Sequence, residues 1–468
     1  MKRALIMFMG VVLLGVACKK SDDQPNPGGG GNNGGGPDAS GTYPIRGVIS
    51  TDQHWTKDKT YRLRGYVYVT NGATITIDPG TKIVSNKDSA GVLVIYRTAK
   101  INASGTASEP IVFTSNEKDA DKKPGDLGGV VIVGQAKGNA NHVVIEGGVD
   151  PQFSVFGGTN DADNSGTLKY VRIEYAGKAV NPGDEVNGLS LYGVGSGTTI
   201  DYVQVVRGLD DAFEFFGGTV NAKHLIAYNC ADDDFDMDDG FSGKIQFAIS
   251  IKDPAFTDDK GSSGDLSNNF EVDNVNPSNG YTLNKQPITA PTLSNFTAIG
   301  PNNASGTKAD YGYGMRWRRG AKFILANSIV MGGQKAGLVI ENDSTGNYYM
   351  RDTSKFYNSF LHSVTAPYLV QQMPTSPLYT NLDATSLKAF VEGRDGSKLY
   401  ASADDIKLTA PFNNAAPNLK PAAGSPALTT AAKFDLAKLN VAFFDKVTYI
   451  GALDATTDWT AGWTVWGK

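Results

Sequence analysis

Carboxylates are concentrated in the stretch from Gly208 to Phe241, which consists of one unit followed by a more acidic copy of itself. The copies are related by a shift of 22 residues, which pairs Asp210 with Asp232, Asp211 with Asp233 and Glu214 with Asp236. Six aspartates fall within the eight positions from 232 to 239. Carboxylates this close together repel one another unless a cation neutralises them. We therefore expect this stretch to bind a ligand, with Asp210, Asp211, Asp232 and Asp233 as ligand-binding residues.

The chain around this stretch is built from recurring short strands. Six five-residue segments have an apolar residue at their second and fourth places: Gly188–Tyr192, Ala212–Phe216, Asp234–Asp238, Asn269–Asp273, Gly314–Arg318 and Gly337–Glu341. Because side chains alternate along a strand, the second and fourth places point inward and the third and fifth point outward. Strand patterns that recur with a period of about 22 residues are typical of a solenoid of stacked coils.

Stacking the coils arranges the outward acids in two vertical files. The third places carry Glu214, Asp236 and Glu271, and the fifth places carry Phe216, Asp238 and Asp273. Strands stack about 4.8 Å apart, and Ca²⁺ takes roughly six to eight oxygen ligands. The files therefore predict a Ca²⁺ ion held across coils, with Glu214, Asp236, Asp238, Glu271 and Asp273 as its ligands. A local EF-hand loop is not indicated, because Gly240 comes one place late and Ile245 replaces the closing glutamate.

Two other interpretations of the acidic face stay open. Arg316 and Arg318 occupy the third and fifth places of the next coil, where their guanidinium groups would neutralise the files as a structural ladder. The remaining interpretation is a solvated face without a bound partner. Tyr192 and Phe216 stand at fifth places beside the acids, and outward aromatic rings in that position favour a sugar as the ligand.

A second series of strands places Tyr202, His224 and Gln246 at one recurring position in the middle of an apolar strand. Asn229, Asn327 and Asn358 follow such strands, as expected of asparagines at turns between sheets. Two polar inserts, Asp253–Asn268 and Asn274–Pro291, leave the solenoid beside the acidic coil, and loops in such a place either wall a cleft or decorate the surface.

The end of the chain departs from the repeat. Residues 383–394 are the one short helix that the pattern predicts. The segment Asp458–Trp466 carries three tryptophans, which we expect to plug the open end of the solenoid rather than to stack on a sugar.

The N-terminus predicts the compartment. Lys2 and Arg3 precede an apolar run of 14 residues, Ala4–Ala17, which is followed by Cys18. The run is too short to span a bilayer, so we interpret it as a signal peptide. Small residues before a cysteine resemble a bacterial lipoprotein signal, in which Cys18 is the site of lipid attachment. The expected divisions are a signal peptide (1–17), the lipidated cysteine with a Gly/Pro/Asn-rich tether (18–40), the solenoid (41–380) and a C-terminal capping region (381–468).

Composition excludes several classes of protein. The net charge of −5 argues against nucleic acid as a partner. Two cysteines leave little material for a disulfide framework or a zinc site. Four histidines, His54, His142, His224 and His362, lie in separate parts of the repeat, so no catalytic triad is indicated.

Particular segments resemble known β-helix proteins. Ala73–Ile83 and Lys100–Ser115 resemble the opening coils of right-handed parallel β-helix surface proteins. Gly128–Gly134 and Gly166–Gly177 resemble a largely uncharacterised, pectate-lyase-like lipoprotein family of Bacteroidota. The resemblance covers roughly residues 45–365 and implies an all-β fold, a single-stranded right-handed parallel β-helix. Lys19–Asp23 also resembles the export signal of Bacteroidota surface lipoproteins, which implies an outer-membrane location, lipid-anchored and facing the cell exterior.

The same resemblance raises an enzymatic alternative. Pectate-lyase-like enzymes hold Ca²⁺ on stacked carboxylates and use a nearby Arg or Lys as the base, so Arg316 or Arg318 would be the catalytic residue of a polysaccharide lyase. Inverting polygalacturonases use three aspartates, but their Gly-His-Gly and Arg-x-Lys elements are missing from the matching coils. We therefore expect binding of a glycan or another surface component, rather than catalysis, by a Ca²⁺-loaded acidic face. A lyase or hydrolase on the same face, and a structural or adhesive spacer, are the alternatives, and an outer-membrane transporter is a possible partner.

Overall fold

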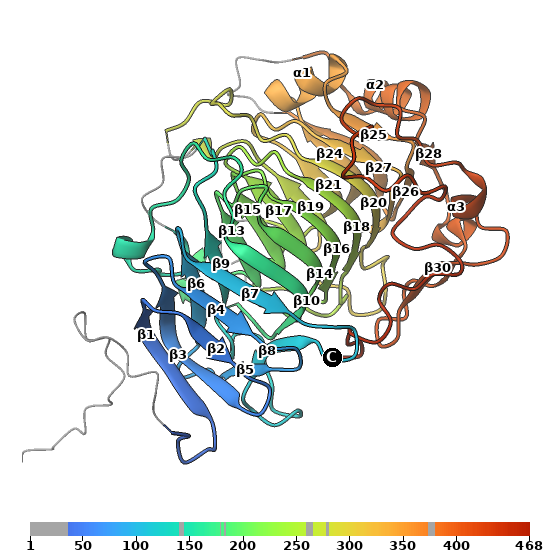
Figure 1. The fold of residues 1–468 in the computed structure, drawn as a ribbon. Helices are drawn as coiled ribbons and strands as arrows, with labels where there is room; N and C mark the ends of the chain where they lie inside the picture. Colours follow the sequence, from blue (N-terminus) through green and yellow to red (C-terminus); the bar gives the residue numbers. More distant parts are fainter. Residues whose placement is uncertain are drawn as a thin grey trace, which may run out of the picture.

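A computed structural model describes residues 36–468 apart from 140–144, 178, 182–183, 259–264, 278–279 and 373–379. Its dominant feature is one 26-stranded sheet, which runs from β1 (Tyr43–Ile49) to β28 (Lys398–Leu399). The pairings of this sheet are parallel and join each coil to the next, so that the sheet winds into a β-helix (Figure 1). The predicted all-β parallel β-helix is confirmed. The signal peptide, Cys18 and most of the predicted tether lie outside the described residues.

Each coil contributes strands to three stacks. The first stack, which we call the site stack, continues from the second half of β3 (Thr60–Val69) through strands at one position of successive coils. Its later members are β6 (Val92–Tyr96), β9 (Gly129–Val133), β13 (Leu189–Tyr192), β15 (Phe213–Phe216), β17 (Phe235–Asp238), β19 (Phe270–Val272), β21 (Tyr313–Trp317), β24 (Ala336–Glu341) and β27 (Ala366–Gln371).

The other two stacks lie side by side. In the early and late coils they use separate strands: β2 (Gln53–Trp55), β4 (Thr74–Ile77), β7 (Lys100–Ser104), β22 (Ile324–Ala326) and β25 (Lys355–Tyr357) in one, and β5 (Lys82–Ser85), β8 (Ile111–Ser115), β23 (Ile329–Gly333) and β26 (Phe360–Ser363) in the other. In the middle coils one long bent strand serves both: β10 (Gly166–Glu174), β14 (Thr199–Val206), β16 (Asn221–Tyr228), β18 (Lys244–Ile251) and β20 (Thr292–Ile299).

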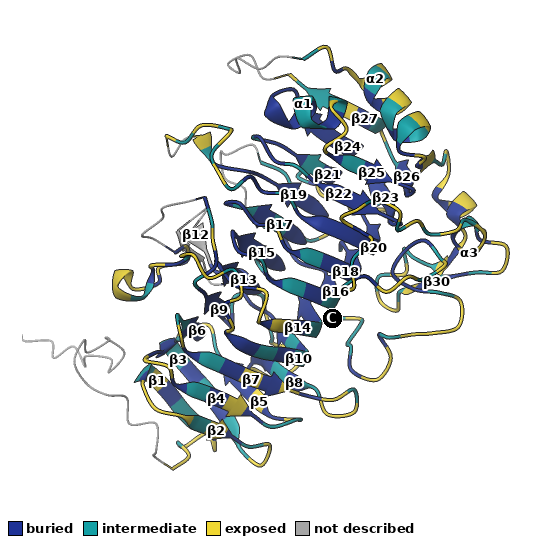
Figure 2. Ribbon diagram, turned by 45° about the horizontal axis from the view of Figure 1, so that its top comes forward, coloured by how far each residue is buried: buried dark blue, intermediate teal, exposed yellow. Residues whose placement is uncertain are grey.

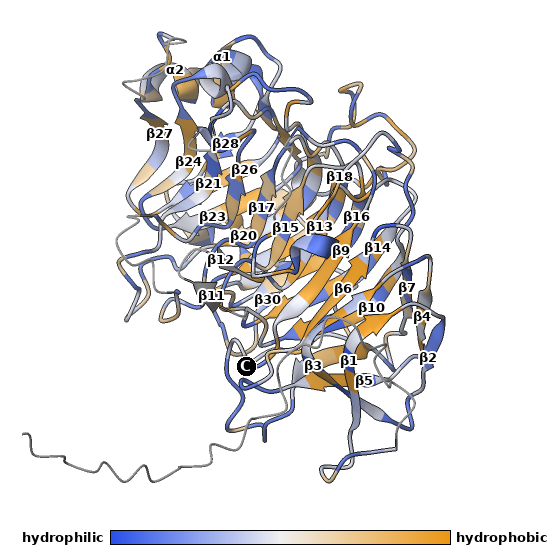
Figure 3. Ribbon diagram, turned by 90° about the vertical axis from the view of Figure 1, so that its left-hand side faces the viewer, coloured by the Kyte–Doolittle hydropathy of each residue, from blue (hydrophilic) through white to orange (hydrophobic). Residues whose placement is uncertain are grey.

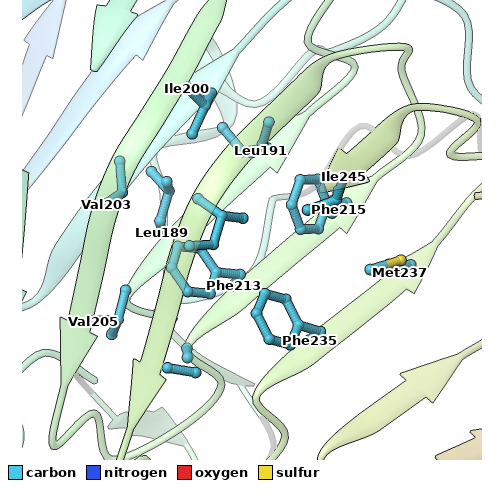
Figure 4. Close-up of a cluster of buried hydrophobic side chains, with 14 of the residues drawn as sticks. Leu189, Leu191, Ile200, Val203, Val205, Phe213, Phe215, Phe235, Met237 and Ile245 are labelled. Carbon is cyan, nitrogen blue, oxygen red and sulfur yellow. The ribbon is translucent and has the colours of Figure 1, made fainter. Parts of the chain in front are cut away.

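Inward side chains of the site stack fill the solenoid. Phe213, Phe215, Phe235 and Met237 are fully buried beneath the acidic strands and come from the predicted second and fourth places (Figure 4). Phe213 stacks on Phe235 with ring centroids 5.3 Å apart. Burial of apolar surface stabilises the fold by about 25 cal/mol per Å². A slip of one residue would expose these side chains, so their burial fixes the register of the strands. Figure 3 shows the resulting apolar strands inside a more polar set of loops.

The recurring position between the second and third stacks is a corner and not the middle of a straight strand. Tyr202 and His224 have φ angles of 54° and 52°, in the left-handed region, where the chain bends from one stack into the other. Strand register places Phe247 opposite His224, since Lys223 pairs with Gln246 and Leu225 with Ala248. The predicted equivalence of His224 with Gln246 is therefore wrong by one residue, because the coil that contains Gln246 is one residue longer.

Asparagine occupies the same corner in later coils. Asn327 and Asn358 have φ angles of 52° and 49°, and the Nδ2 of Asn358 donates to the Oδ1 of Asn327 at 2.9 Å. Asn229 lies at the next turn, with a φ angle of 59°. Asparagine tolerates the left-handed region better than most residues, so the prediction of turn asparagines is confirmed.

The C-terminal region covers two different surfaces of the solenoid, its end and one lateral face. As predicted, residues 384–394 are helical and form α2 (Ala384–Ala389) and a π-helix (Phe390–Arg394). Asp383 is the N-cap of α2 and forms a capping box with Ser386. Leu387 and Val391 of this element are buried in the same core as the last coils, together with Tyr349 of α1 (Ser344–Met350). This short helix, and not the tryptophan segment, covers the C-terminal end of the solenoid.

Residues 400–468 run back along the side of the β-helix (Figure 1). They include β29 (Leu408–Ala410), β30 (Asn418–Pro421) and α3 (Pro426–Thr429). Trp463 lies edge-on against Tyr170 and Tyr202, with ring centroids 5.8 and 5.9 Å away, and the backbone carbonyl of Trp463 accepts a hydrogen bond from Arg172. The predicted plug at the open end is therefore wrong for the tryptophans, which cover a lateral face. None of the described helices combines the length and the apolar composition that a membrane span requires.

This lateral packing predicts a large stability effect with no effect on the acidic face. Trp463 is fully buried, and replacing a buried Trp by Ala costs about 3–5 kcal/mol. We expect Trp463→Ala to lower the free energy of unfolding by that amount, measured by urea denaturation. Unchanged stability would mean that the C-terminal segment does not pack on the corner residues.

Candidate metal centre

The acidic file lies in the register that the sequence predicts. Glu214 of β15 is opposite Asp236 of β17, Asp236 is opposite Glu271 of β19, and Glu271 is opposite Arg316 of β21. The position of each member is fixed by the buried side chains that flank it along its own strand, as Phe235 and Met237 flank Asp236 in β17. Register in a parallel stack is therefore what brings together carboxylates that are up to 57 residues apart in the chain, from Glu214 to Glu271.

A further file, which the sequence analysis missed, runs beside this one. Asn187, Asp211, Asp233 and Asn268 each stand directly before an aligned segment, and each is buried. Asp211 accepts a hydrogen bond from the backbone N–H of Asp233, and Asp233 accepts one from the backbone N–H of Asn268. The sequence does contain a signal for this file: in four consecutive coils, the residue directly before the aligned five-residue segment is Asn or Asp.

The files line a small acidic cavity of ≈ 150 Å³. Its walls are Glu146, Asn187, Asp210, Asp211, Glu214, Asp232, Asp233, Asp236, Asp265 and Glu271. This volume is below the range of about 300–1,000 Å³ that small-molecule sites occupy, and it has room for a cation with a few bound waters. Figure 2 shows that the site strands β13, β15 and β19 are buried although this face points away from the core.

Three groups of three carboxylates could hold an ion in this cavity. Within each group the ligand oxygens lie within 4.8 Å of one another: Asp210, Asp211 and Asp232; Asp211, Glu214 and Asp236; Asp233, Asp236 and Glu271. Asp211 and Asp236 each belong to two groups. The middle group, Asp211 with Glu214 and Asp236, has no cationic partner among the described residues, and we call it the central triad.

The central triad is electrostatically costly without a counterion. Burial raises the pKa of Asp211, Glu214 and Asp236 well above the usual range, and repulsion by neighbouring carboxylates raises it further. Clustered, buried acids of this kind could bind a metal ion, which would remove both penalties.

Two oxygens in the cavity wall point to the same conclusion. Asn187 is 1% exposed, its Nδ2 donates to Glu214, and its Oδ1 accepts no hydrogen bond from any described residue. The Oδ1 of Asp236 is also buried without a donor among those residues. A buried acceptor that lacks a donor costs about 1–3 kcal/mol, and a hard cation bound to oxygen ligands would satisfy both atoms. The residues present therefore fit a divalent cation.

The fold and the site can be set beside known proteins. The sequence model of a family described as a pectate-lyase-like β-helix domain matches residues 47–401. The chain belongs to this family. The crystal structure of pectate lyase Pel9A is 13% identical, with coverage of 82% of this chain and 88% of that chain and a TM-score of 0.36, which is too low to support a comparison of sites. No curated protein matches the chain.

In this pectate-lyase-like domain the arginines neutralise only one end of the acidic file. Arg318 pairs with Glu271 and, at 2.7 Å, with Asp273, while Arg319 reaches the other oxygen of Asp273 at 2.7 Å. Arg316 lies 3.1 Å from Glu271 and 2.8 Å from Asp265. The arginine ladder that the sequence left open therefore describes Glu271 and Asp273, whereas no arginine pairs with the central triad among the described residues.

The ion pairs also concern Arg316 and Arg318 as the candidate catalytic base of a lyase. Arg316 and Arg318 have side chains only 12% and 7% exposed. Although burial opposes their charge, the surrounding carboxylates raise the pKa of both guanidinium groups above the usual value. A base must lose its proton before it can accept one, and the raised pKa of these two arginines opposes that loss.

Two predicted metal ligands fall outside the three carboxylate groups. Asp238 accepts a hydrogen bond from the backbone N–H of Asp239, and Asp273 is held by Arg318 and Arg319. Neither is a member of a group in the described residues. Glu214, Asp236 and Glu271 are members, as are the predicted ligand-binding residues Asp210, Asp211, Asp232 and Asp233.

The two aromatic residues do not form an open platform. Tyr192 is 2% exposed and Phe216 is 6% exposed, and their rings stack on each other at 4.1 Å. Phe156, from the loop after β9, covers Tyr192 edge-on at 5.2 Å. The prediction that these rings stack on a sugar is therefore wrong, because a loop from a distant part of the coil packs over them. Of the two polar inserts, Asp253–Asn268 supplies a wall residue, Asp265.

Proposed function

We propose that this protein binds Ca²⁺ at the central triad and that the loaded face binds a glycan. The observation that carries the proposal is the cavity itself, where three groups of carboxylates overlap and the middle group has no described cationic partner. Asp211, Glu214 and Asp236 would hold the ion, with Asn187 supplying a neutral oxygen. When bound, the ion supplies a divalent positive charge that offsets the carboxylates and attracts anionic or hydroxyl oxygens of a ligand.

The glycan is supported by the family and by the shape of the site. The pectate-lyase-like β-helix fold suggests a carbohydrate-related function. The cavity is too small for an oligosaccharide, so the ligand would lie across its mouth, near Asp210 and Asp232, which are partly exposed. Anionic sugars are favoured, because a carboxylate oxygen of the sugar can serve as a further oxygen ligand of the bound Ca²⁺.

The test is binding of defined oligosaccharides with and without the ion. Oligogalacturonate and a neutral galactan oligomer should be titrated into the purified protein in Ca²⁺ and in EDTA. We expect the anionic oligomer to bind more tightly in Ca²⁺ than in EDTA, and the neutral oligomer to show a smaller difference. Equal binding in EDTA, or no binding in either buffer while Ca²⁺ itself binds, would contradict the glycan part of the proposal.

The raised pKa values predict how stability depends on pH. Burial raises the pKa of Glu271 and of Glu341 to about 7 and that of Asp234 to about 6. A raised pKa means that the folded protein holds the proton more tightly than the unfolded chain, so this stabilisation is present at low pH and is lost as the pH rises through 6–7. In EDTA we expect the Tm to fall between about pH 5 and about pH 8.

Calcium reverses this trend, because ligand carboxylates must be deprotonated to bind a metal. The increase in Tm caused by Ca²⁺ should therefore grow over the same pH range, measured by differential scanning calorimetry. A Ca²⁺ effect that is largest at the acidic end would contradict ligation by the carboxylates of the central triad.

A polysaccharide lyase or glycoside hydrolase is the second candidate. What favours it is that burial raises the pKa of Glu214 well above its usual value, which favours the protonated form that a general acid needs. Release of reducing ends or of unsaturated uronate from the same oligosaccharides, lost in Glu214→Gln, would establish catalysis. A stable mixture over a day would leave binding as the function.

We also propose that Cys18 carries a lipid and presents the β-helix at the outer-membrane surface, where a glycan or an outer-membrane transporter would be its partner. The support is the sequence of residues 2–18 and the acidic residues that follow. Cys18→Ser should move the protein from the membrane fraction to the soluble fraction, and a variant that stays in the membrane fraction would exclude the anchor.

A further inference from the structure

We propose a second ligand site, separate from the acidic cavity, that binds an anionic, hydroxyl-rich ligand such as a carboxylated saccharide. The site is a pocket of ≈ 560 Å³, lined by the loop Asn303–Ala309 and by Gln334, Lys335 and Thr365 of the next coils. This volume lies within the range of about 300–1,000 Å³ that small-molecule sites occupy. The proposal does not depend on metal binding.

The charge of the pocket is the first argument. Lys308 and Lys335 line it, and no acidic residue does, although the whole chain has a net charge of −5. Both lysines are exposed, and neither forms an ion pair with any residue that the structure describes. A pocket that two lysines line, and that no acidic residue lines, attracts a carboxylate or another anion.

Neighbouring coils hold the wall of the pocket in place. The backbone N–H of Asn303 donates to the Oε1 of Gln334 at 3.0 Å, and the Oγ1 of Thr365 donates to the carbonyl of Gln334 at 2.8 Å. The backbone N–H of Lys308 donates to the carbonyl of Pro254 at 2.9 Å, and that of Lys335 donates to the carbonyl of Gly312 at 2.8 Å. Both lysines therefore extend from anchored backbone.

The remaining lining groups suit a ligand with many hydroxyl groups. Ser305 and Thr307 contribute hydroxyls, and Asn303 and Gln334 contribute amides that can both donate and accept. Gly306 has a φ angle of 84°, and a Cβ at this position would meet no atom within 4 Å, so the backbone at the tip of the loop is open to a ligand. An inorganic anion would use the two ammonium groups alone, whereas a carboxylated saccharide would use the ammonium groups and the polar wall.

The test uses EDTA throughout, so that the acidic cavity holds no cation. A galacturonic acid tetramer should be titrated into the wild-type protein and into Lys308→Ala/Lys335→Ala by calorimetry. We expect the double variant to bind at least roughly tenfold more weakly, because two charge-assisted contacts are lost. We also expect the wild-type affinity to fall as salt is added.

A matched variant separates this site from the rest of the surface. Lys87→Ala/Lys398→Ala removes two exposed lysines elsewhere and should leave the affinity unchanged. No binding by the wild type in EDTA, equal binding by the two double-lysine variants, or equally tight binding of inorganic phosphate would each overturn the proposal.

Discussion

Asp236→Asn is expected to weaken Ca²⁺ binding by at least about tenfold, or about 1.4 kcal/mol, and at the same time to raise the Tm of the metal-free protein. Asp236 belongs to two of the three carboxylate groups, so its replacement removes a ligand oxygen from both. The opposite effect on the metal-free protein follows from repulsion, because burial and the charges of Glu271 and Asp273 already raise the pKa of Asp236. Calcium titration calorimetry and thermal unfolding in EDTA measure the two effects.

Asp238→Asn is the matched control for this prediction. It makes the same change of charge on the same strand, β17, but Asp238 belongs to none of the carboxylate groups. We expect its Ca²⁺ affinity to stay close to the wild-type value. Equal losses in the two variants would mean that net negative charge, and not ligation by Asp236, determines the affinity.

Arg318→Ala is expected to destabilise the protein by about 3–5 kcal/mol, because it leaves buried carboxylates without their counterion. The guanidinium of Arg318 contacts Glu271 and Asp273, which are 5% and 4% exposed. Chemical denaturation should show this loss in EDTA. Calcium should restore part of it, since Glu271 is a member of one carboxylate group.

A compensating variant tests whether the loss arises from the uncompensated charges. Replacing Arg318 by Met together with Glu271→Gln and Asp273→Asn removes the cation and both anions, and we expect it to recover most of the stability. If the triple variant is as unstable as Arg318→Ala, the packing of the arginine side chain matters more than its charge.

The parts of this site that could be predicted from the sequence are those set by local alternation. Phe235 and Met237 alternate with Asp234, Asp236 and Asp238, and burial of the two apolar residues leaves one register for the strand. That register was enough to place Glu214, Asp236, Glu271 and Arg316 in one file. The capping box at Asp383 is equally local and was equally predictable.

What could not be predicted depends on contacts between distant parts of the chain. Phe156 covers Tyr192 across 36 residues, and nothing in the alternation of β13 indicates that a loop will lie over it. The side chain of Trp463 packs on Tyr202 from the other end of the chain, which a repeat pattern cannot show. The division between arginine-paired and arginine-free acids was also hidden, because the reach of Arg318 to both Glu271 and Asp273 is a matter of side-chain geometry.

The central claim is that the central triad, Asp211, Glu214 and Asp236, is a cation site. The most direct measurement is calorimetric titration of Ca²⁺ into the wild-type protein after removal of metals with EDTA. We predict saturable binding with a Kd of about 10⁻⁴ M or tighter, in the range of extracellular Ca²⁺ modules and stronger sites. The absence of saturable heat up to about 10 mM Ca²⁺, well above that range, together with an unchanged Tm would contradict the claim.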